Sequence, residues 1–293
     1  MLPGQPVAVE DPTFPGVLDA LHRAGARVIG MPACGGLDPE RLEHVVRTHG
    51  PAMVYLIPTH HNPTGLVMPA EHRHRVVRLA AAHPDTLFVD DMTLAELRLV
   101  HGPRRLPLAA LAPRQANVVS VGSLSKLYWG GLRIGWIRAS GGLMARLAAA
   151  KAAADLGSTA FGQALVAALL RGPHEDIVKW RAEWLRSRHD ALADALRSCL
   201  PGWSWPEPEG GLTLWIRLPG PADSSAFAQA ALRRGVALVP GRLLSASGPA
   251  AGGRQRAGGS ALAASRHVRI AFAQPPDVLR AAARRLAALH AGG

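Results

Sequence analysis

Along the first two-thirds of this chain, short apolar segments alternate with longer segments of helical periodicity, and this alternation limits the possible folds more than any other feature. The apolar segments are nearly continuous, as expected for strands buried on both faces of a sheet. Such strands, separated by helices, indicate a mostly parallel sheet with helices on both faces, which is an α/β fold. The predicted strands cover residues 7–9, 27–30, 52–57, 86–89, 117–121 and 132–137, and the predicted helices between them cover residues 15–24, 39–49 and 69–83.

From about residue 143 onward, the sequence no longer alternates between short strands and helices in this way. An Ala- and Leu-rich helical region is predicted from Leu143 to Leu200, with breaks at Gly157 and at Gly172-Pro173. We expect a large domain over residues 1–190 and a smaller α+β domain over residues 191–293, with a flexible loop at residues 245–265, where Gly, Ala, Ser and Arg occur without periodicity. The predicted elements of the smaller domain are strands at residues 211–218, 236–239 and 268–272 and helices at residues 224–234 and 276–289.

Composition excludes several classes of protein. The 293 residues are 48% hydrophobic and 18% charged, which excludes a disordered chain, and two cysteines exclude a disulfide framework or a four-cysteine zinc site. No apolar run reaches the roughly 18–20 residues that span a bilayer, and the first residues do not resemble a signal peptide. We therefore expect a soluble cytoplasmic protein without a membrane partner. The net charge of +12 is spread along the chain, so we interpret it as solvated helix surface.

Four segments that could carry chemistry follow predicted strands. They are Asn62-Pro63-Thr64-Gly65, Asp90-Asp91, Ser123-Leu124-Ser125-Lys126 and the segment 130–136. In open α/β sheets, ligands bind beyond the carboxyl ends of the strands. Each segment alone also has a structural explanation as a turn or a cap, but Lys126 is unexpected, because burying an ammonium costs several kcal/mol unless a partner or an adduct removes the charge. The histidines near these segments lack metal-ligand spacing, so no metal site is expected.

The order and spacing of these four segments resemble the fold-type-I pyridoxal-phosphate enzymes, the class I and II aminotransferases. The resemblance runs from Glu10-Asp11-Pro12-Thr13-Phe14 to Val268-Arg269-Ile270-Ala271-Phe272. More narrowly, the segments 10–16, 58–65 and 121–126 resemble the aminotransferase-like domain of MocR-type regulators. These are transcription factors of the GntR family, in which a winged helix-turn-helix is fused to such a domain.

The resemblance implies pyridoxal 5'-phosphate as the cofactor and an amino acid or a 2-oxo acid as the substrate. Lys126 matches the catalytic lysine that forms a Schiff base with the cofactor aldehyde. Asp90 matches the aspartate that pairs with the pyridine nitrogen and keeps the ring an electron sink. Asn62 matches the donor to the ring hydroxyl, and Phe14 matches the aromatic residue that stacks on the ring.

The resemblance also implies residues for the two anionic groups of the cofactor and substrate. Ser123, Ser125 and Arg133 match ligands of the cofactor phosphate, for which a guanidinium is well suited. Arg269 matches the arginine that binds the α-carboxylate of the substrate. A homodimer is expected from the same resemblance, and DNA binding is expected only through a fused domain that this chain does not contain.

Two departures from the family pattern bear on activity. Met92, Thr93 and Leu94 stand where the family has a tyrosine soon after the aspartate. The glycine-rich phosphate loop of the family lies upstream of the segment with which this chain begins, so we expect an N-terminally truncated member that lacks the first strand and the phosphate loop. Hydrogen bonds to a charged group contribute roughly 1.5–3 kcal/mol each, so losing two would weaken cofactor binding by on the order of 10²–10⁴-fold.

These observations leave three hypotheses. The first is an aminotransferase that moves an amino group between an amino acid and a 2-oxo acid through Lys126. The second is the cofactor-binding, effector-sensing domain of a MocR-type regulator, in which exchange at the lysine changes conformation without turnover. The third is a truncated remnant without catalytic activity.

Overall fold

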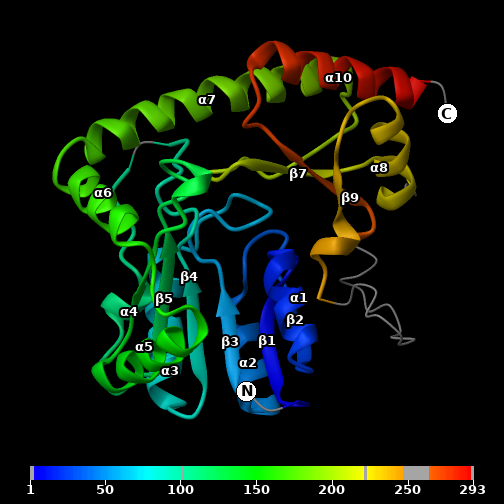
Figure 1. Cartoon of the computed structure of the whole chain (residues 1–293). Coiled ribbons are helices and arrows are strands. Elements are labelled where there is room, and N and C mark those ends of the chain that lie inside the picture. Colours follow the sequence, from blue (N-terminus) through cyan, green and yellow to red (C-terminus); the bar gives the residue numbers. More distant parts are fainter. Residues whose placement is uncertain (1–2, 101, 221–222, 247–263, 292–293) are drawn as a thin grey trace.

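The computed structural model describes residues 3–100, 102–220, 223–246 and 264–291, and it contains two sheets (Figure 1). The larger sheet has the strand order β2-β1-β3-β4-β5-β6, and the smaller one has the order β7-β9-β8. In the larger sheet, β2, β1, β3, β4 and β5 are parallel and β6 is antiparallel. The predicted fold class, a mostly parallel α/β sheet with a smaller C-terminal α+β part, is confirmed. The strands of the larger sheet are β1 (Pro6–Asp11), β2 (Arg27–Pro32), β3 (Met53–Leu56), β4 (Leu87–Asp91), β5 (Val118–Ser123) and β6 (Gly135–Arg138).

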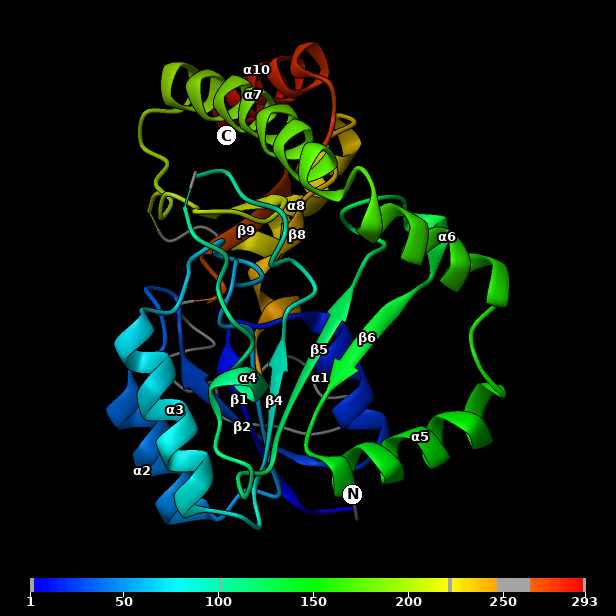
Figure 2. The ribbon, with the colours of Figure 1, turned by 90° about the vertical axis from the view of Figure 1, so that its left-hand side faces the viewer.

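Helices cover both faces of the larger sheet, as Figure 2 shows. On one face lie α2 (Pro39–His49), α3 (Ala70–Ala82) and the short α4 (Leu108–Leu111). Their apolar residues pack with every second strand residue, including Val54, Phe88 and Val118. On the other face, α1 (Pro15–Arg23) packs with Val7, Val9 and Tyr55. A strand turns successive side chains to opposite faces, so the two clusters together account for the nearly continuous apolar runs.

The start and end of α2 show how local sequence sets an element. Asp38 is the N-cap, its carboxylate accepts a hydrogen bond from the backbone N–H of Glu40 at 2.9 Å, and Pro39 takes the first helical position. Gly50 ends the helix with a φ of 49°, in the left-handed region that glycine adopts without strain. The expected boundaries of this helix are therefore confirmed.

The predicted Ala- and Leu-rich region forms three helices, and its breaks fall where the glycines predict them. These helices are α5 (Gly141–Asp155), α6 (Ala160–Arg171) and α7 (His174–Cys199). The expected domain boundary at residue 190 lies inside α7, which continues without a break. Leu185, Leu192 and Leu196 of α7 belong to the same core cluster as Leu214 and Ile270 of the smaller sheet.

The smaller sheet and its helices form the other end of the molecule (Figure 1). The predicted strand 236–239 reduces to two residues, because the backbone N–H of Val236 still bonds to the carbonyl of Ala231 at the end of α8. Most of the expected flexible loop at 245–265 lies outside the described residues. The elements are β7 (Thr213–Arg217), α8 (Ser224–Arg233), β8 (Val239–Pro240), the 3-10 helix η2 (Gly241–Leu244), β9 (His267–Ala271) and α10 (Pro276–Ala291). Among the described helices, none has the length and apolar character needed to cross a membrane.

Candidate active site

The predicted site residues gather at one edge of the larger sheet. Phe14 follows β1, Asn62 follows β3, and Lys126 follows β5, while β4 ends at Asp91. These four strands are parallel neighbours, so their carboxyl ends lie side by side. The register places Leu56 of β3 beside Asp90, and Asp91 beside Val121 of β5. Residues that are up to 112 positions apart therefore meet at one edge of the sheet.

The turn that carries Asn62 is fixed by its glycine. The backbone N–H of Gly65 donates to the carbonyl of His61 at 2.6 Å, and Gly65 has a φ of 74°. A Cβ atom at this position would overlap the Cβ of Pro208 and come within 2.8 Å of the carbonyl oxygen of Gly210. Only glycine fits both the conformation and the space, which explains the last residue of the Asn-Pro-Thr-Gly segment.

Asn62 and Arg269 are brought together although 207 positions separate them. The guanidinium of Arg269, on β9, donates to Oδ1 of Asn62 at 3.0 Å. Thr213 of β7 also donates its hydroxyl to the carbonyl of Pro63 at 3.1 Å. Arg269 is half-buried, and burial lowers the pKa of its guanidinium. The smaller sheet thus places a guanidinium group at the carboxyl edge of the larger sheet.

Asp90 lies one residue before the end of β4, and its side chain is turned to the face covered by α4. Its Oδ2 accepts hydrogen bonds from the backbone N–H of Leu108 at 2.7 Å and from the hydroxyl of Ser120 at 2.6 Å. The residue is completely buried, and this burial raises the pKa of its carboxyl. Oδ1 is covered by protein atoms as well and has no hydrogen-bond partner among the described residues. Asp90 is therefore placed as an internal acceptor beneath α4 and β5, where no small molecule reaches it.

Asp91 points to the opposite face of the sheet and is only partly buried. Its Oδ2 accepts a hydrogen bond from the hydroxyl of Tyr55, and its Oδ1 accepts one from the backbone N–H of Thr93 at 2.8 Å. Thr93 is one of the three residues that stand where the resemblance predicts a tyrosine, and it contacts this carboxylate through its backbone. The resemblance assigns the cofactor role to Asp90. Strand alternation places the two carboxylates on opposite faces of the sheet, and the packing of α4 over one face determines which of them is covered.

Ser123 is the last residue of β5, and the connection from β5 to β6 carries Ser125, Lys126 and Arg133. Lys126 is exposed, and within the described part of the chain its ammonium makes no hydrogen bond or ion pair. Ser123 accepts a hydrogen bond from the backbone N–H of Ser125 at 3.2 Å. Arg133 has a φ of 52°, which interrupts the predicted strand 132–137 and delays β6 to Gly135. Its side chain is exposed, as is that of Phe14, at 41%.

A buried acid–imidazole pair lies behind the site. Oε2 of Glu10 accepts a hydrogen bond from the backbone N–H of Ile57 at 2.6 Å and lies 3.6 Å from Nε2 of His61. Burial raises the pKa of Glu10 to about 8 and lowers the pKa of His61 to about 4. Both shifts favour the neutral forms, so at neutral pH the two side chains are uncharged neighbours and form no ion pair.

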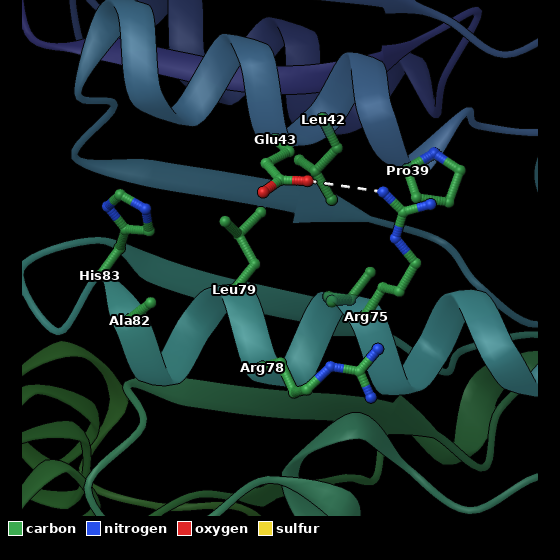
Figure 3. A pocket seen from close by; sticks show the side chains of 9 residues that line it. Pro39, Leu42, Glu43, Arg75, Arg78, Leu79, Ala82 and His83 are labelled. Carbon is green, nitrogen blue, oxygen red and sulfur yellow. Dashed lines mark hydrogen bonds and ion pairs between the residues drawn. The ribbon is translucent and has the colours of Figure 1, made fainter.

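Two cavities lie away from the lysine. A cavity of about 290 Å³ lies between α2 and α3, and its lining includes Leu42 and Leu79 (Figure 3). Arg75 pairs with Glu43 beside them at 3.4 Å. A second cavity, of about 560 Å³, has Glu10, His61 and Arg75 among its lining residues. No predicted site residue lines either cavity. Within the residues that the structure describes, no group of three or more His, Cys, Asp or Glu side chains is arranged to hold a metal ion.

The fold and these positions define a class of protein. The family model for aminotransferase class I and II matches residues 1–286, so the chain belongs to this family. It is 32% identical over 247 residues to aromatic-amino-acid aminotransferase 1 of Thermococcus litoralis, covering 82% of this chain and 58% of that protein. It is 29% identical over 238 residues to the HTH-type transcriptional regulator YisV of Bacillus subtilis, covering 80% of this chain and 49% of that protein.

A solved structure agrees with this assignment. The α-aminoadipate aminotransferase LysN of Thermus thermophilus, complexed with N-(5'-phosphopyridoxyl)-L-leucine, matches with a TM-score of 0.87 and 27% identity. The match covers all of this chain and 72% of that one. The chain spans about half to three-fifths of the length of the two relatives named above.

Proposed function

We propose that this chain binds pyridoxal 5'-phosphate at the carboxyl edge of the larger sheet and transfers an amino group between an amino acid and a 2-oxo acid. The observation that carries the proposal is the contact of Arg269 with Asn62, because it sets a carboxylate-binding group from the smaller sheet beside a predicted cofactor residue. A planar guanidinium binds a carboxylate through two parallel hydrogen bonds, which suits an α-carboxylate.

The residues present fit the cofactor once the aspartate is reassigned. We propose Asp91 in place of Asp90 as the carboxylate for the pyridine nitrogen, because Asp91 is partly open and already held by two donors, whereas Asp90 is sealed. Lys126 would supply the amine that attaches to the aldehyde. Ser123, Ser125 and Arg133 would bind the phosphate, Asn62 the ring hydroxyl and Phe14 the ring face.

When bound, pyridoxal phosphate serves as an electron sink for the bonds at the substrate Cα. The chain's own residues supply the rest of the chemistry. Arg269 would hold and orient the substrate carboxylate, Asp91 would keep a positive charge at the ring nitrogen, and the amine of Lys126 would hold the proton taken from Cα.

A homodimer is part of the proposal. All four residues of β6 are exposed, and α5 has no buried residue in its 15 positions. Nearby, Trp129, Leu156 and Phe161 are 62%, 95% and 79% exposed. Apolar surface of this extent is typical of a face that another polypeptide covers, and a second copy of the chain is the partner proposed here. Size-exclusion chromatography with light scattering tests it, since a strictly monomeric chain at micromolar concentration contradicts it.

A second function is favoured by one specific observation. The chain is about as similar to the regulator YisV as to the aminotransferase of Thermococcus litoralis, at 29% and 32% identity. The second candidate is therefore a domain that senses an amino acid through the same lysine without turnover.

The test of the proposal is a visible absorption band that appears when the purified chain is mixed with pyridoxal phosphate. Lys126→Ala should abolish the band, and Lys151→Ala is the matched control, because Lys151 lies on α5 and pairs with Asp155 at 2.6 Å. A free-aldehyde spectrum in the wild type, or a band that survives in Lys126→Ala, contradicts the proposal. Conversion to the pyridoxamine form by an amino acid then distinguishes an aminotransferase from a sensor.

A further inference from the structure

Tyr55 is one of two tyrosines in the chain, and it stands on β3 beside the strand that carries Asp91. The register pairs Tyr55 with Val89, so Asp91 lies two residues further along the neighbouring strand and on the same face. Such diagonal neighbours are within reach of a long side chain. Tyr55 is 6% exposed and belongs to the cluster that includes Val7, Val9 and Ile57. Its hydroxyl donates to Oδ2 of Asp91.

The phenol of Tyr55 keeps its proton and so remains a hydrogen-bond donor. Burial raises its pKa well above 10, and the negative charge of Asp91 acts in the same direction. The proton therefore stays on the phenol oxygen across the physiological range. A phenol fixed in an apolar cluster also offers its hydrogen in one direction only, unlike a water molecule.

The second oxygen of Asp91 is held independently. Oδ1 accepts the backbone N–H of Thr93 at 2.8 Å, two residues along the chain. One donor on each oxygen fixes the plane of the carboxylate, since a rotation of the group breaks both bonds. A carboxylate offers about four acceptor positions, so these two bonds leave room for one more cationic donor.

We infer that Tyr55 is a positioning residue, whose hydroxyl orients the carboxylate of Asp91 toward the protonated nitrogen of a pyridine ring. This inference rests on the proposed function and adds a residue to the same site. In this role Tyr55 acts on the ligand only through Asp91, so its influence must be specific for the ring nitrogen.

The ring nitrogen provides the test. The dissociation constants of pyridoxal phosphate and of its 1-deaza analogue, in which a C–H replaces the nitrogen, are measured for wild type and Tyr55→Phe. We expect Tyr55→Phe to weaken binding of pyridoxal phosphate by roughly tenfold, the change that about 1.4 kcal/mol produces, and to leave binding of the deaza analogue unchanged. The variant removes one oxygen and keeps the ring in its apolar cluster, so it should fold.

Thr86→Val is the matched control for the loss of a buried hydroxyl. Thr86 precedes β4, at the opposite end of this strand from Asp91, and donates to the carbonyl of Pro51 at 2.9 Å. It should affect stability without changing the affinity for either cofactor. In the Asp91→Asn background, Tyr55→Phe should have no further effect on binding of pyridoxal phosphate, because the group through which it acts is gone.

The outcomes separate this inference from the proposed function. Suppose that wild type binds pyridoxal phosphate and that Tyr55→Phe weakens the binding of both cofactors equally, or of neither. Tyr55 then has only a structural role, and the inference is overturned while the proposed function stands. If the effect of Tyr55→Phe persists undiminished in Asp91→Asn, the inference is also overturned. If wild type binds no pyridoxal phosphate, the proposed function is overturned together with this inference.

Discussion

Replacing Asp90 or Asp91 by asparagine should have different effects on the binding of pyridoxal phosphate. In Asp90→Asn, the amide oxygen can accept both bonds now made to Oδ2, from Leu108 and Ser120. The amide NH₂ then occupies the position of Oδ1, which is buried without a partner in the described part of the chain. An unpaired buried donor costs about 1–3 kcal/mol, so the free energy of unfolding should fall by about that amount. Binding of pyridoxal phosphate by the folded variant should not change.

Asp91→Asn should have its main effect on the affinity for pyridoxal phosphate. The amide oxygen can keep only one of the two hydrogen bonds that the carboxylate accepts from Tyr55 and Thr93, so the replacement should cost about 0.5–1.5 kcal/mol of stability. The variant loses a charge-assisted hydrogen bond to the ring nitrogen, worth about 1.5–3 kcal/mol, which corresponds to binding weakened by roughly 10–100-fold. Urea denaturation followed by circular dichroism measures stability, and a spectrophotometric titration measures cofactor affinity. If Asp90→Asn loses affinity and Asp91→Asn does not, the assignment of Asp91 is refuted, and with it the reasoning from strand alternation.

Two further predictions concern the folded state. Glu10→Gln should remove a pH dependence of the free energy of unfolding. The pKa of Glu10 rises from 4.5 to about 8 on folding, so between these pH values the folded chain keeps a proton that the unfolded chain releases. The wild type should therefore lose on the order of a few kcal/mol of stability as pH rises through this interval, and Glu10→Gln should not. If the urea midpoints of wild type and Glu10→Gln change equally with pH over this interval, Glu10 is not the group responsible. Leu192→Ala, in the core of α7, should cost about 2–5 kcal/mol, whereas Leu232→Ala, on α8 at a position that is 63% exposed, should stay within about 0.5 kcal/mol. Equal losses in these two variants, measured by the same denaturation, would contradict the packing described for α7.

The order of the elements and most of their bounds were predictable, because each depends on a few neighbouring residues. Asp38 and Pro39 start α2, Gly50 ends it, and apolar runs of strand length become strands of the larger sheet. The predictions were less accurate where backbone geometry interrupts a run. Arg133, in the left-handed region, divides the predicted strand 132–137 into a 3-10 turn, η1 (Gly130–Leu132), and β6.

The sequence by itself determined the architecture and the edge of the sheet at which the candidate site lies, since parallel strands bring their carboxyl ends together whatever covers them. Only the tertiary structure decided which carboxylate is available there. β4 is apolar on both faces, so its sequence does not show that α4, which begins 18 positions after Asp90, covers one face and leaves Asp91 on the other. The contact of Asn62 with Arg269 and the hydroxyl of Tyr55 on Asp91 likewise depend on distant segments meeting in space. Local patterns fix where a side chain stands along an element, whereas its partners are fixed by packing between elements.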